Sequence, residues 1–206
     1  MIDALERAAG RPVSRETLAL LEAYVERLKS ANSTQNLVAE STLDHIWDRH
    51  IADSAQLVRF EPRPGASWVD IGSGAGLPGV IIAALVAGPV TLVEPRRLRA
   101  EFLEETVSAL GLSDRVAIRL AKIEHVRGPF DAITARAVAP LGRLLGMGLH
   151  LAHSGTIWAL PKGRSAKSEL AEARRSWQCE VRSETSCTDP QATILVLSKV
   201  KAKSKR

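Results

Sequence analysis

The feature that most constrains this chain is the glycine-rich run from Asp70 to Gly79, which reads Asp-Ile-Gly-Ser-Gly-Ala-Gly-Leu-Pro-Gly. It follows a short apolar segment containing Trp68-Val69 and opens an apolar stretch with helical character. Glycines at alternate positions allow positive φ angles and close approach of the backbone to a ligand. A strand, a glycine-rich turn and a helix in this order predict a binding site for a nucleotide-like ligand.

Two kinds of ligand are compatible with this turn. Residues 74–79 satisfy the GxGxxG pattern of a nicotinamide or flavin site, but the first glycine after the strand is Gly72, so that frame begins two residues late. Read from Gly72, the run places Asp70 at the strand end, where a carboxylate repels a pyrophosphate and favours a cationic ligand. S-adenosylmethionine carries a sulfonium and an ammonium group and no phosphate. It is the predicted cofactor, and the turn supplies the predicted contacts Asp70, Gly72, Ser73, Gly74 and Gly76.

Two further acidic residues fit such a ligand. Glu94 ends the next predicted strand, 24 residues after Asp70, where its carboxylate either accepts hydrogen bonds from ribose hydroxyls or is a solvated loop acid. Glu124 follows the third predicted strand, and together with a backbone amide at Ile123 it could face the adenine.

The pattern from residue 67 onwards alternates short apolar strands with helices. The predicted strands are 67–71, 90–94, 115–120, 130–134, 155–160, 178–184 and 192–198. The predicted helices are 78–87, 97–110, 138–151 and 164–176. This alternation predicts an α/β fold with a doubly wound, Rossmann-like, mostly parallel sheet. The last two strands are joined by only a short polar link, which predicts an antiparallel C-terminal hairpin of the kind found in S-adenosylmethionine methyltransferases.

Two helices are predicted before this sheet. Residues 14–30 have apolar side chains at helical spacing, with Ser14 as N-cap, and the polar stretch Ser30 to Gln35 ends that helix. A second helix starts at Ser41, where Asp44 completes a capping-box pattern. The predicted organisation is a helical extension packed on the core (1–64), a methyltransferase domain (65–198) and a basic tail (199–206).

The charge of the chain is concentrated at its C-terminus. Lys and Arg number 28 against 23 Asp and Glu, and five of the basic residues lie within Lys199–Arg206, which contains no acid. The tail is compatible with phosphate contacts or with a disordered, solubilising terminus.

No apolar run reaches membrane-spanning length and none near the N-terminus resembles an export segment, so a cytoplasmic protein is expected. Cys179 and Cys187 have neither the spacing of a metal site nor the setting of a disulfide, and no metal is predicted.

Segments outside the turn carry a more specific pattern. They are Asn36-Leu37, Trp47 to Ser54 (Trp-Asp-Arg-His-Ile-Ala-Asp-Ser), Glu94 with Phe102-Leu103, Phe130 to Ala137 (Phe-Asp-Ala-Ile-Thr-Ala-Arg-Ala), and Lys162-Gly163. Together with the turn, these segments resemble the small-subunit (16S) ribosomal RNA guanine-N7 methyltransferases, the glucose-inhibited division protein B family. The resemblance covers roughly residues 36–163. The Arg-His-x-x-Asp-Ser stretch and the later Thr-x-Arg-Ala stretch are its most specific parts.

This resemblance implies an enzyme that methylates N7 of a guanine in 16S ribosomal RNA with S-adenosylmethionine. The implied partner is that RNA or the small ribosomal subunit, and the expected state is a monomer. The cofactor contacts that the resemblance implies are Gly72, Leu77, Ile123, Glu124 and Arg136, with Glu94 on the ribose.

The chain departs from the family at two places. Pro95-Arg96-Arg97 stands where the family commonly has serine and lysines, which preserves the charge. Lys122-Ile123 stands where an arginine-alanine pair often precedes the glutamate, which leaves only a backbone contact secure at residue 123.

Guanine N7 carries a lone pair, so its methylation needs alignment and exclusion of water but no base. Consistent with this, the residues directly after the fourth predicted strand contain neither the Asn/Asp-Pro-Pro-aromatic motif that favours amino-group methylation nor the cysteine that pyrimidine C5 methylation requires. Arg136, just beyond that strand, can donate to guanine O6, to a phosphate or to the cofactor carboxylate, or it can pair with Asp131 or a helix terminus. Lys162, at the end of the fifth strand, either contacts RNA phosphate or guanine or is solvated. Arg136 and Lys162 are the predicted catalytic residues.

Other interpretations remain open from the sequence alone. A nicotinamide-dependent reductase would use the same turn, and a non-catalytic RNA-binding module could retain the fold. His50 lies on the apolar face of its helix, which favours a buried, hydrogen-bonded histidine over a chemical role. Arg49 and Asp53 are four positions apart and could pair along the helix.

Overall fold

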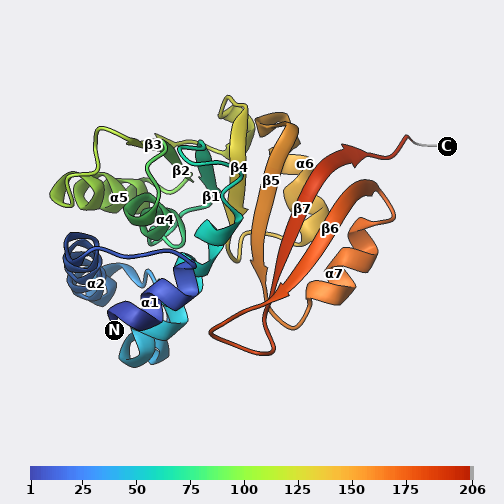
Figure 1. Cartoon of the computed structure of the whole chain (residues 1–206). Helices are drawn as coiled ribbons and strands as arrows, with labels where there is room; N and C mark the ends of the chain where they lie inside the picture. The colour runs from blue at the N-terminus through green and yellow to red at the C-terminus, as the bar shows by residue number, and fades with distance from the viewer. Residues whose placement is uncertain (205–206) are drawn as a thin grey trace.

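The computed structural model describes residues 1–204, which fold around a single mixed sheet (Figure 1). Its strands are β1 (Trp68–Ile71), β2 (Val90–Glu94), β3 (Val116–Leu120), β4 (Phe130–Ala135), β5 (Ala152–Lys162), β6 (Trp177–Thr185) and β7 (Thr193–Ala202). They lie in the order β3-β2-β1-β4-β5-β7-β6. The first five strands are parallel, and β7 runs antiparallel to both β5 and β6. The predicted doubly wound sheet with an antiparallel C-terminal hairpin is confirmed.

Helices and short helical turns connect and cover the strands. The α-helices are α1 (Ile2–Ala9), α2 (Arg15–Gln35), α3 (Asp53–Ala55), α4 (Gly79–Leu85), α5 (Arg97–Ala109), α6 (Leu141–Gly148) and α7 (Ala166–Ala173). The short helical turns are η1 (Glu40–His45), η2 (Trp47–Ala52), η3 (Gln56–Phe60), η4 (Ile123–His125) and η5 (Leu149–Leu151).

The N-terminal helices differ in part from their prediction. Ser14 does cap α2, because its hydroxyl accepts a hydrogen bond from the amide of Thr17 at 3.1 Å. However, α2 continues through the polar stretch Ser30 to Gln35 and ends only where Asn36 adopts a left-handed conformation, with φ of 48°. The predicted capping box at Ser41 is wrong, since η1 begins at Glu40 without a side-chain cap. Residues 40–60 form successive 3-10, π and α turns rather than one helix.

Side chains of alternate residues in the same strands belong to two hydrophobic cores, one on each face of the sheet. Trp68, Leu92 and Ala132 point to the face covered by the N-terminal helices, α4 and α5. Their neighbours Val69 and Val93 point to the opposite face, where α6 and α7 pack. This alternation follows from the two-residue period of a strand and buries the central sheet on both sides.

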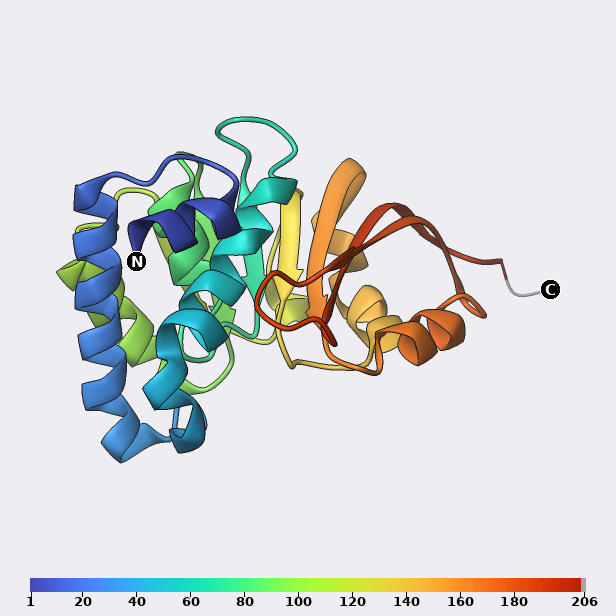
Figure 2. The same ribbon diagram turned by 60° about the horizontal axis from the view of Figure 1, so that its bottom comes forward.

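The N-terminal segment shares a core with the sheet. Leu21, Tyr24 and Leu28 of α2 are fully buried in the same cluster as Trp68 and Ile82. Figure 2 shows the N-terminal helices along one side of the molecule, next to α4 and α5, with the C-terminal hairpin at the other end. The domain division at residue 64 stays a prediction.

The last strand extends into the segment that was assigned to a basic tail. β7 continues through Ala202, and Lys201 is in register with Gln178 of β6. The Lys199 ammonium lies 2.7 Å from the Glu180 carboxylate. Residues 199–202 are therefore part of the sheet, whereas Lys205 and Arg206 lie outside the described residues. Across residues 1–204, no helix has both the length and the apolar character that a bilayer crossing requires.

The strand order indicates where a ligand would bind, at the carboxyl ends of the central strands. β1 is flanked by β2 on one side and by β4 on the other, so the direction of winding reverses between β1 and β4. Open α/β sheets bind ligands in the crevice at the carboxyl ends of the strands beside such a reversal. The loops that follow Ile71, Glu94 and Ala135 all lie at this edge.

Candidate functional site

The glycine-rich turn adopts a conformation that requires its glycines. Gly72, Gly74 and Gly76 have φ angles of 70°, 56° and 92°, in the region that L side chains rarely adopt. A Cβ atom at Gly72 would lie 2.7 Å from a methyl group of Val138, which follows β4. The amides of Gly72 and Ser73 donate to the Val93 carbonyl at 2.8 and 3.0 Å, so the turn folds tightly over the end of β2. It therefore offers bare backbone at the predicted cofactor position.

Two buried side chains hold this turn from below. The Glu94 carboxylate accepts hydrogen bonds from the amides of Gly74 and Arg96, both at 2.9 Å. The Tyr24 hydroxyl of α2 donates to the Ala75 carbonyl at 2.8 Å. In the sequence, Tyr24 is one of the apolar positions of the helix predicted at residues 14–30, with no sign of this contact. Glu94 thus fixes the turn, and its contact with a ribose stays a prediction.

Asp70 lies beneath the turn as a strongly buried acid, with 1% of its surface exposed. Its Oδ2 accepts the Gly79 amide at 3.1 Å, whereas Oδ1 is buried and has no hydrogen-bond partner within residues 1–204. Burial raises the pKa of this carboxyl to about 7, against the hydrogen bond from the Gly79 amide and the charge of Arg136, which lower it. A cation above the turn would favour the ionised form, so this buried carboxyl with a free oxygen fits a positively charged ligand such as S-adenosylmethionine.

The other predicted cofactor contacts are divided between core and surface. Ser73 is buried, and its hydroxyl donates to the Asp70 carbonyl at 3.0 Å. The side chains of Leu77 and Ile123 are buried in the two cores, which leaves their main-chain atoms to meet a ligand. Glu124 is exposed beside Ile123 in η4.

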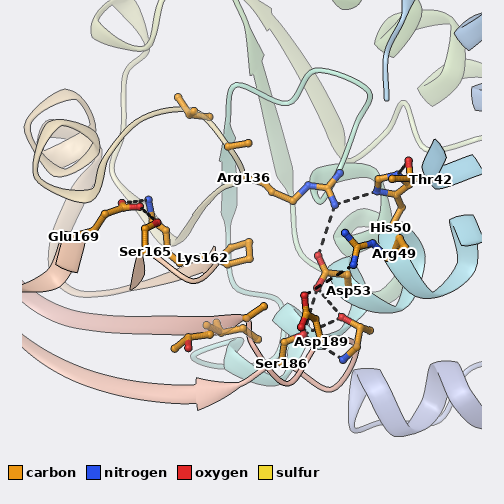
Figure 3. A pocket seen from close by; sticks show the side chains of 18 of the residues that line it. Thr42, Arg49, His50, Asp53, Arg136, Lys162, Ser165, Glu169, Ser186 and Asp189 are labelled. Carbon is orange, nitrogen blue, oxygen red and sulfur yellow. Dashed lines mark hydrogen bonds and ion pairs between the residues drawn. The ribbon is translucent and has the colours of Figure 1, made fainter. Parts of the chain in front are cut away.

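A cavity of about 560 Å³ opens at the carboxyl ends of β4 and β5 (Figure 3). Four parts of the chain line it: the 42–53 segment, residues 136–140 after β4, residues 161–169 around the end of β5, and residues 186–194 of the β6–β7 hairpin. It contains both predicted catalytic residues, Arg136 and Lys162, but none of the glycines of the turn. The site therefore has two neighbouring parts, the turn at β1 and β2 and the cavity at β4 and β5.

Arg136 is held by two residues of the N-terminal segment (Figure 3). Its Nη1 atom lies 3.3 Å from Nδ1 of His50 and 3.7 Å from Oδ2 of Asp53. Asp131, the partner that was considered from the sequence, instead pairs with Arg63 at 2.9 Å at the opposite edge of the sheet. Arg49 does not pair with Asp53 either, and its guanidinium lies 3.9 Å from Asp189.

His50 is buried and hydrogen-bonded, as predicted. Burial, and then the charges of Arg136 and Arg49, lower the pKa of its imidazole to about 4. The neutral ring accepts from Arg136 at Nδ1 and donates from Nε2 to the Thr42 hydroxyl at 2.7 Å. That hydroxyl in turn donates to the Ala39 carbonyl at 2.6 Å. His50 therefore serves as a hydrogen-bond acceptor for Arg136 at neutral pH.

Lys162 is held on the other wall of the cavity. Its ammonium donates to the Ala139 carbonyl at 3.1 Å and to Glu169 at 2.9 Å, and only 11% of its side chain is exposed. Although burial opposes ionisation of Glu169, hydrogen bonds from Lys162 and Ser165 keep the pKa of its carboxyl below the usual value. The interpretation of Lys162 as a solvated lysine is wrong.

The carboxylates and the histidine of the cavity are poorly suited to removing a proton from a substrate. Within the described part of the chain, the cavity carboxylates are Asp53, Glu169 and Asp189, and each has a basic side chain as partner. His50, with a pKa near 4, is a weak base at neutral pH. The cavity thus presents N–H donors and no unpaired base, which suits a reaction that needs positioning but no proton removal.

A mostly parallel sheet that ends in an antiparallel hairpin, with a glycine-rich turn and acidic partners at the winding reversal, defines the class of S-adenosylmethionine-dependent methyltransferases. Residues 17–195 match the family described as GidB, rRNA small subunit methyltransferase G. The chain belongs to this family. It therefore uses S-adenosylmethionine, and neither a nicotinamide-dependent reductase nor a non-catalytic RNA-binding module is supported.

Named relatives are similar over nearly the whole chain. The ribosomal RNA small subunit methyltransferase G of Zymomonas mobilis is 44% identical over 203 residues, covering 94% of this chain and 91% of that protein. The protein of the same name from Rhizorhabdus wittichii is 45% identical over 196 residues, covering 94% of this chain and 90% of that protein.

Solved structures share the fold at low sequence identity. TYW2 from Pyrococcus horikoshii, in complex with MeSAdo, matches with a TM-score of 0.58 and 17% identity over 73% of this chain. TrmN from Thermus thermophilus matches with a TM-score of 0.56 and 23% identity over 71% of this chain. The match spans 62% of the first of these longer chains and 48% of the second.

Proposed function

We propose that this methyltransferase transfers the methyl group of S-adenosylmethionine to N7 of a guanine in 16S ribosomal RNA, as a monomer in the cytoplasm. The name of the relatives supports ribosomal RNA as substrate. The observation that carries the choice of N7 is the cavity, in which each described carboxylate has a basic partner and the histidine is a weak base. N7 already has a lone pair, whereas amino and hydroxyl targets lose a proton during transfer.

On the cofactor side, the turn and its acidic partners would hold S-adenosylmethionine, which supplies an electrophilic methyl group. Gly72, Gly74 and Gly76 permit close approach of the backbone. The buried charge of Asp70 would act on the cationic groups from beneath the turn, while Glu94 would meet the ribose. The Ile123 amide and Glu124 would border the adenine.

On the substrate side, Arg136 and Lys162 would orient the base. Among the described residues, no hydrogen bond occupies Nε or Nη2 of Arg136, so these donors remain for guanine O6 or for a carboxylate of the cofactor. The Lys162 ammonium has three N–H groups, of which two are used inside the protein. The third would contact guanine or an RNA phosphate.

The remaining parts of the chain have supporting roles in this proposal. Residues 1–64 would form a helical extension on the catalytic domain, which starts at residue 65 and includes β7 through Ala202. The basic residues of 199–206 add contacts to the phosphate backbone of the RNA.

The direct test is incubation of labelled S-adenosylmethionine with small subunits from cells that lack the protein, followed by mapping of the labelled nucleotide. We expect one guanine labelled at N7. Parallel reactions with naked 16S RNA show whether an assembled particle is required. Label on an exocyclic amine, a ribose or a pyrimidine would refute the N7 assignment.

The raised pKa of Asp70 predicts pH-dependent cofactor binding. A cationic ligand favours the ionised carboxylate, whose fraction increases as the pH passes the pKa of about 7. Binding should therefore tighten by up to about tenfold between pH 6 and pH 8. Isothermal titration calorimetry of wild type and Asp70→Asn measures this dependence. The amino group of the ligand titrates identically in both proteins, so a variant that retains the full wild-type slope would contradict the assignment to Asp70.

A further inference from the structure

Asp53 lies between Arg136 and the β6–β7 hairpin and contacts both (Figure 3). One of its carboxylate oxygens, Oδ2, faces the guanidinium at 3.7 Å. The other, Oδ1, accepts hydrogen bonds from Gln56 Nε2 and Thr188 Oγ1, both at 2.9 Å, and from Ser186 Oγ at 3.5 Å. The two oxygens therefore have different partners, and the side chain cannot rotate without losing several contacts.

The hairpin loop is itself tied to the same short segment. The Gln56 amide donates to Ser186 Oγ at 3.0 Å and accepts the Cys187 amide at 2.9 Å. Gln56 and Ser186 are both buried. Thr188 is 135 positions from Asp53 in the sequence, so this cluster connects parts of the chain that only the fold brings together.

We propose that Asp53 is a positioning residue for Arg136, held in place by Gln56 and Thr188. This inference rests on the proposed function, in which Arg136 orients the guanine or the cofactor. With Oδ1 fixed by the hairpin loop and His50 accepting at the same Nη1, the plane of the guanidinium is defined before substrate binds. The protein contacts then fix the orientation of the remaining N–H donors of Arg136, which are on Nε and Nη2.

The surroundings of Asp53 fit this role better than that of a general base. Its carboxylate accepts from uncharged donors on one side and faces a guanidinium on the other. These contacts occupy the lone pairs of both carboxylate oxygens, which leaves neither of them free to take a proton from a substrate. It contributes by fixing geometry, and displacement of a catalytic group by about 1 Å can cost on the order of 100-fold in rate.

The test compares Asp53→Asn with Asp131→Asn. Both carboxylates pair with an arginine, and their side chains are 19% and 18% exposed, but Asp131 lies at the opposite edge of the sheet. We expect Asp53→Asn to lower kcat for RNA methylation about 30- to 100-fold, with cofactor affinity changed less than about threefold where Arg136 contacts the guanine. Asp131→Asn should keep the wild-type kcat, although it disturbs the two hydrogen bonds that Ser67 donates to this side chain.

A double-mutant cycle separates positioning from direct contact with substrate. If Asp53 acts through Arg136, Asp53→Asn should have almost no further effect in an Arg136→Lys background. If the reductions in kcat caused by the two substitutions instead multiply in the double variant, the proposal is overturned. A kcat of Asp53→Asn within threefold of wild type, while Arg136→Lys is impaired, would overturn it as well. Absence of RNA methylation by the wild type would refute the proposed function instead.

A spectroscopic measurement does not depend on activity. In protein with 15N-labelled arginine, the Arg136 side-chain N–H signals, assigned by their loss in Arg136→Lys, should show restricted rotation in the wild type. In Asp53→Asn this restriction should be lost, and in Asp131→Asn it should be retained. An Arg136 side chain equally rigid in all three proteins would contradict a positioning role.

Discussion

Replacement of Gly72 by aspartate is expected to abolish binding of S-adenosylmethionine and, with it, methyl transfer. Gly72 has a φ of 70°, and a side chain there would start 2.7 Å from Val138, in the space above the turn. The added carboxylate would stand where the backbone must approach the ligand. We expect affinity to fall by at least about 100-fold, which corresponds to about 2.7 kcal/mol. Equilibrium dialysis or calorimetry measures this loss directly.

The fold should survive this substitution. Val138 is partly exposed and can turn away from the new side chain. Gly65→Asp is a matched control, because Gly65 also has a positive φ, of 75°, a Cβ added there would meet no atom within 4 Å, and the residue precedes β1 at the opposite edge of the sheet. Both variants should lose about 1–2 kcal/mol of stability from the left-handed conformation, but only Gly72→Asp should lose the ligand. Unchanged methyl transfer by Gly72→Asp would falsify the assignment of the turn.

Replacement of Arg136 by lysine is expected to lower kcat/KM about 100- to 1000-fold, or about 3–4 kcal/mol of transition-state stabilisation. A lysine keeps the positive charge but cannot present a planar fork of donors to His50, to Asp53 and into the cavity together. Steady-state kinetics with small subunits gives the size of the loss. Calorimetry with S-adenosylmethionine shows which ligand is affected: weakened affinity indicates contact with the cofactor carboxylate, and unchanged affinity indicates contact with the guanine.

Arg63→Lys is the control for this change. Arg63 pairs with Asp131 at 2.9 Å but lies far along the sheet from the cavity, before β1. Its replacement should leave kinetics within about threefold of wild type, as surface ion pairs contribute about 0–1 kcal/mol. If Arg136→Lys also stayed within that range, the role of Arg136 in the reaction would be refuted.

The strands were largely predictable because their boundaries are marked locally. β2 spans Val90–Glu94 as predicted, between Pro89 and Pro95, which cannot continue a central strand. β5 begins earlier than predicted, at Ala152, which pairs with Phe130 ahead of an irregularity in the register, and the intervening residues 153–155 have no hydrophobic pattern that would mark a strand. Helix α1 was missed although Leu5, Ala8 and Ala9 have helical spacing and Gly10 supplies a left-handed C-cap.

The candidate site was predictable only where it is local in sequence. The turn from Asp70 to Gly79 combines a strand end, glycines and a helix start, and each signal lies within ten residues. The cavity wall around Thr188 could not be found this way, because it forms only when β7 inserts between β5 and β6. Gln56 and Ser186 carry no sequence signal of their own, and their role comes from contacts across 130 positions.

The insertion of β7 between β5 and β6 also has a consequence for biosynthesis. β6 pairs with no strand other than β7 in the described chain, yet it leaves the ribosome first. Until residues 193–202 emerge, the nascent chain carries a strand without a partner and an open edge on β5, both of which invite pairing with other chains. The wall of the cavity formed by the hairpin loop is likewise among the last parts to be made. Translation that stalls before β7 would therefore leave an aggregation-prone, inactive fragment rather than a partly active enzyme.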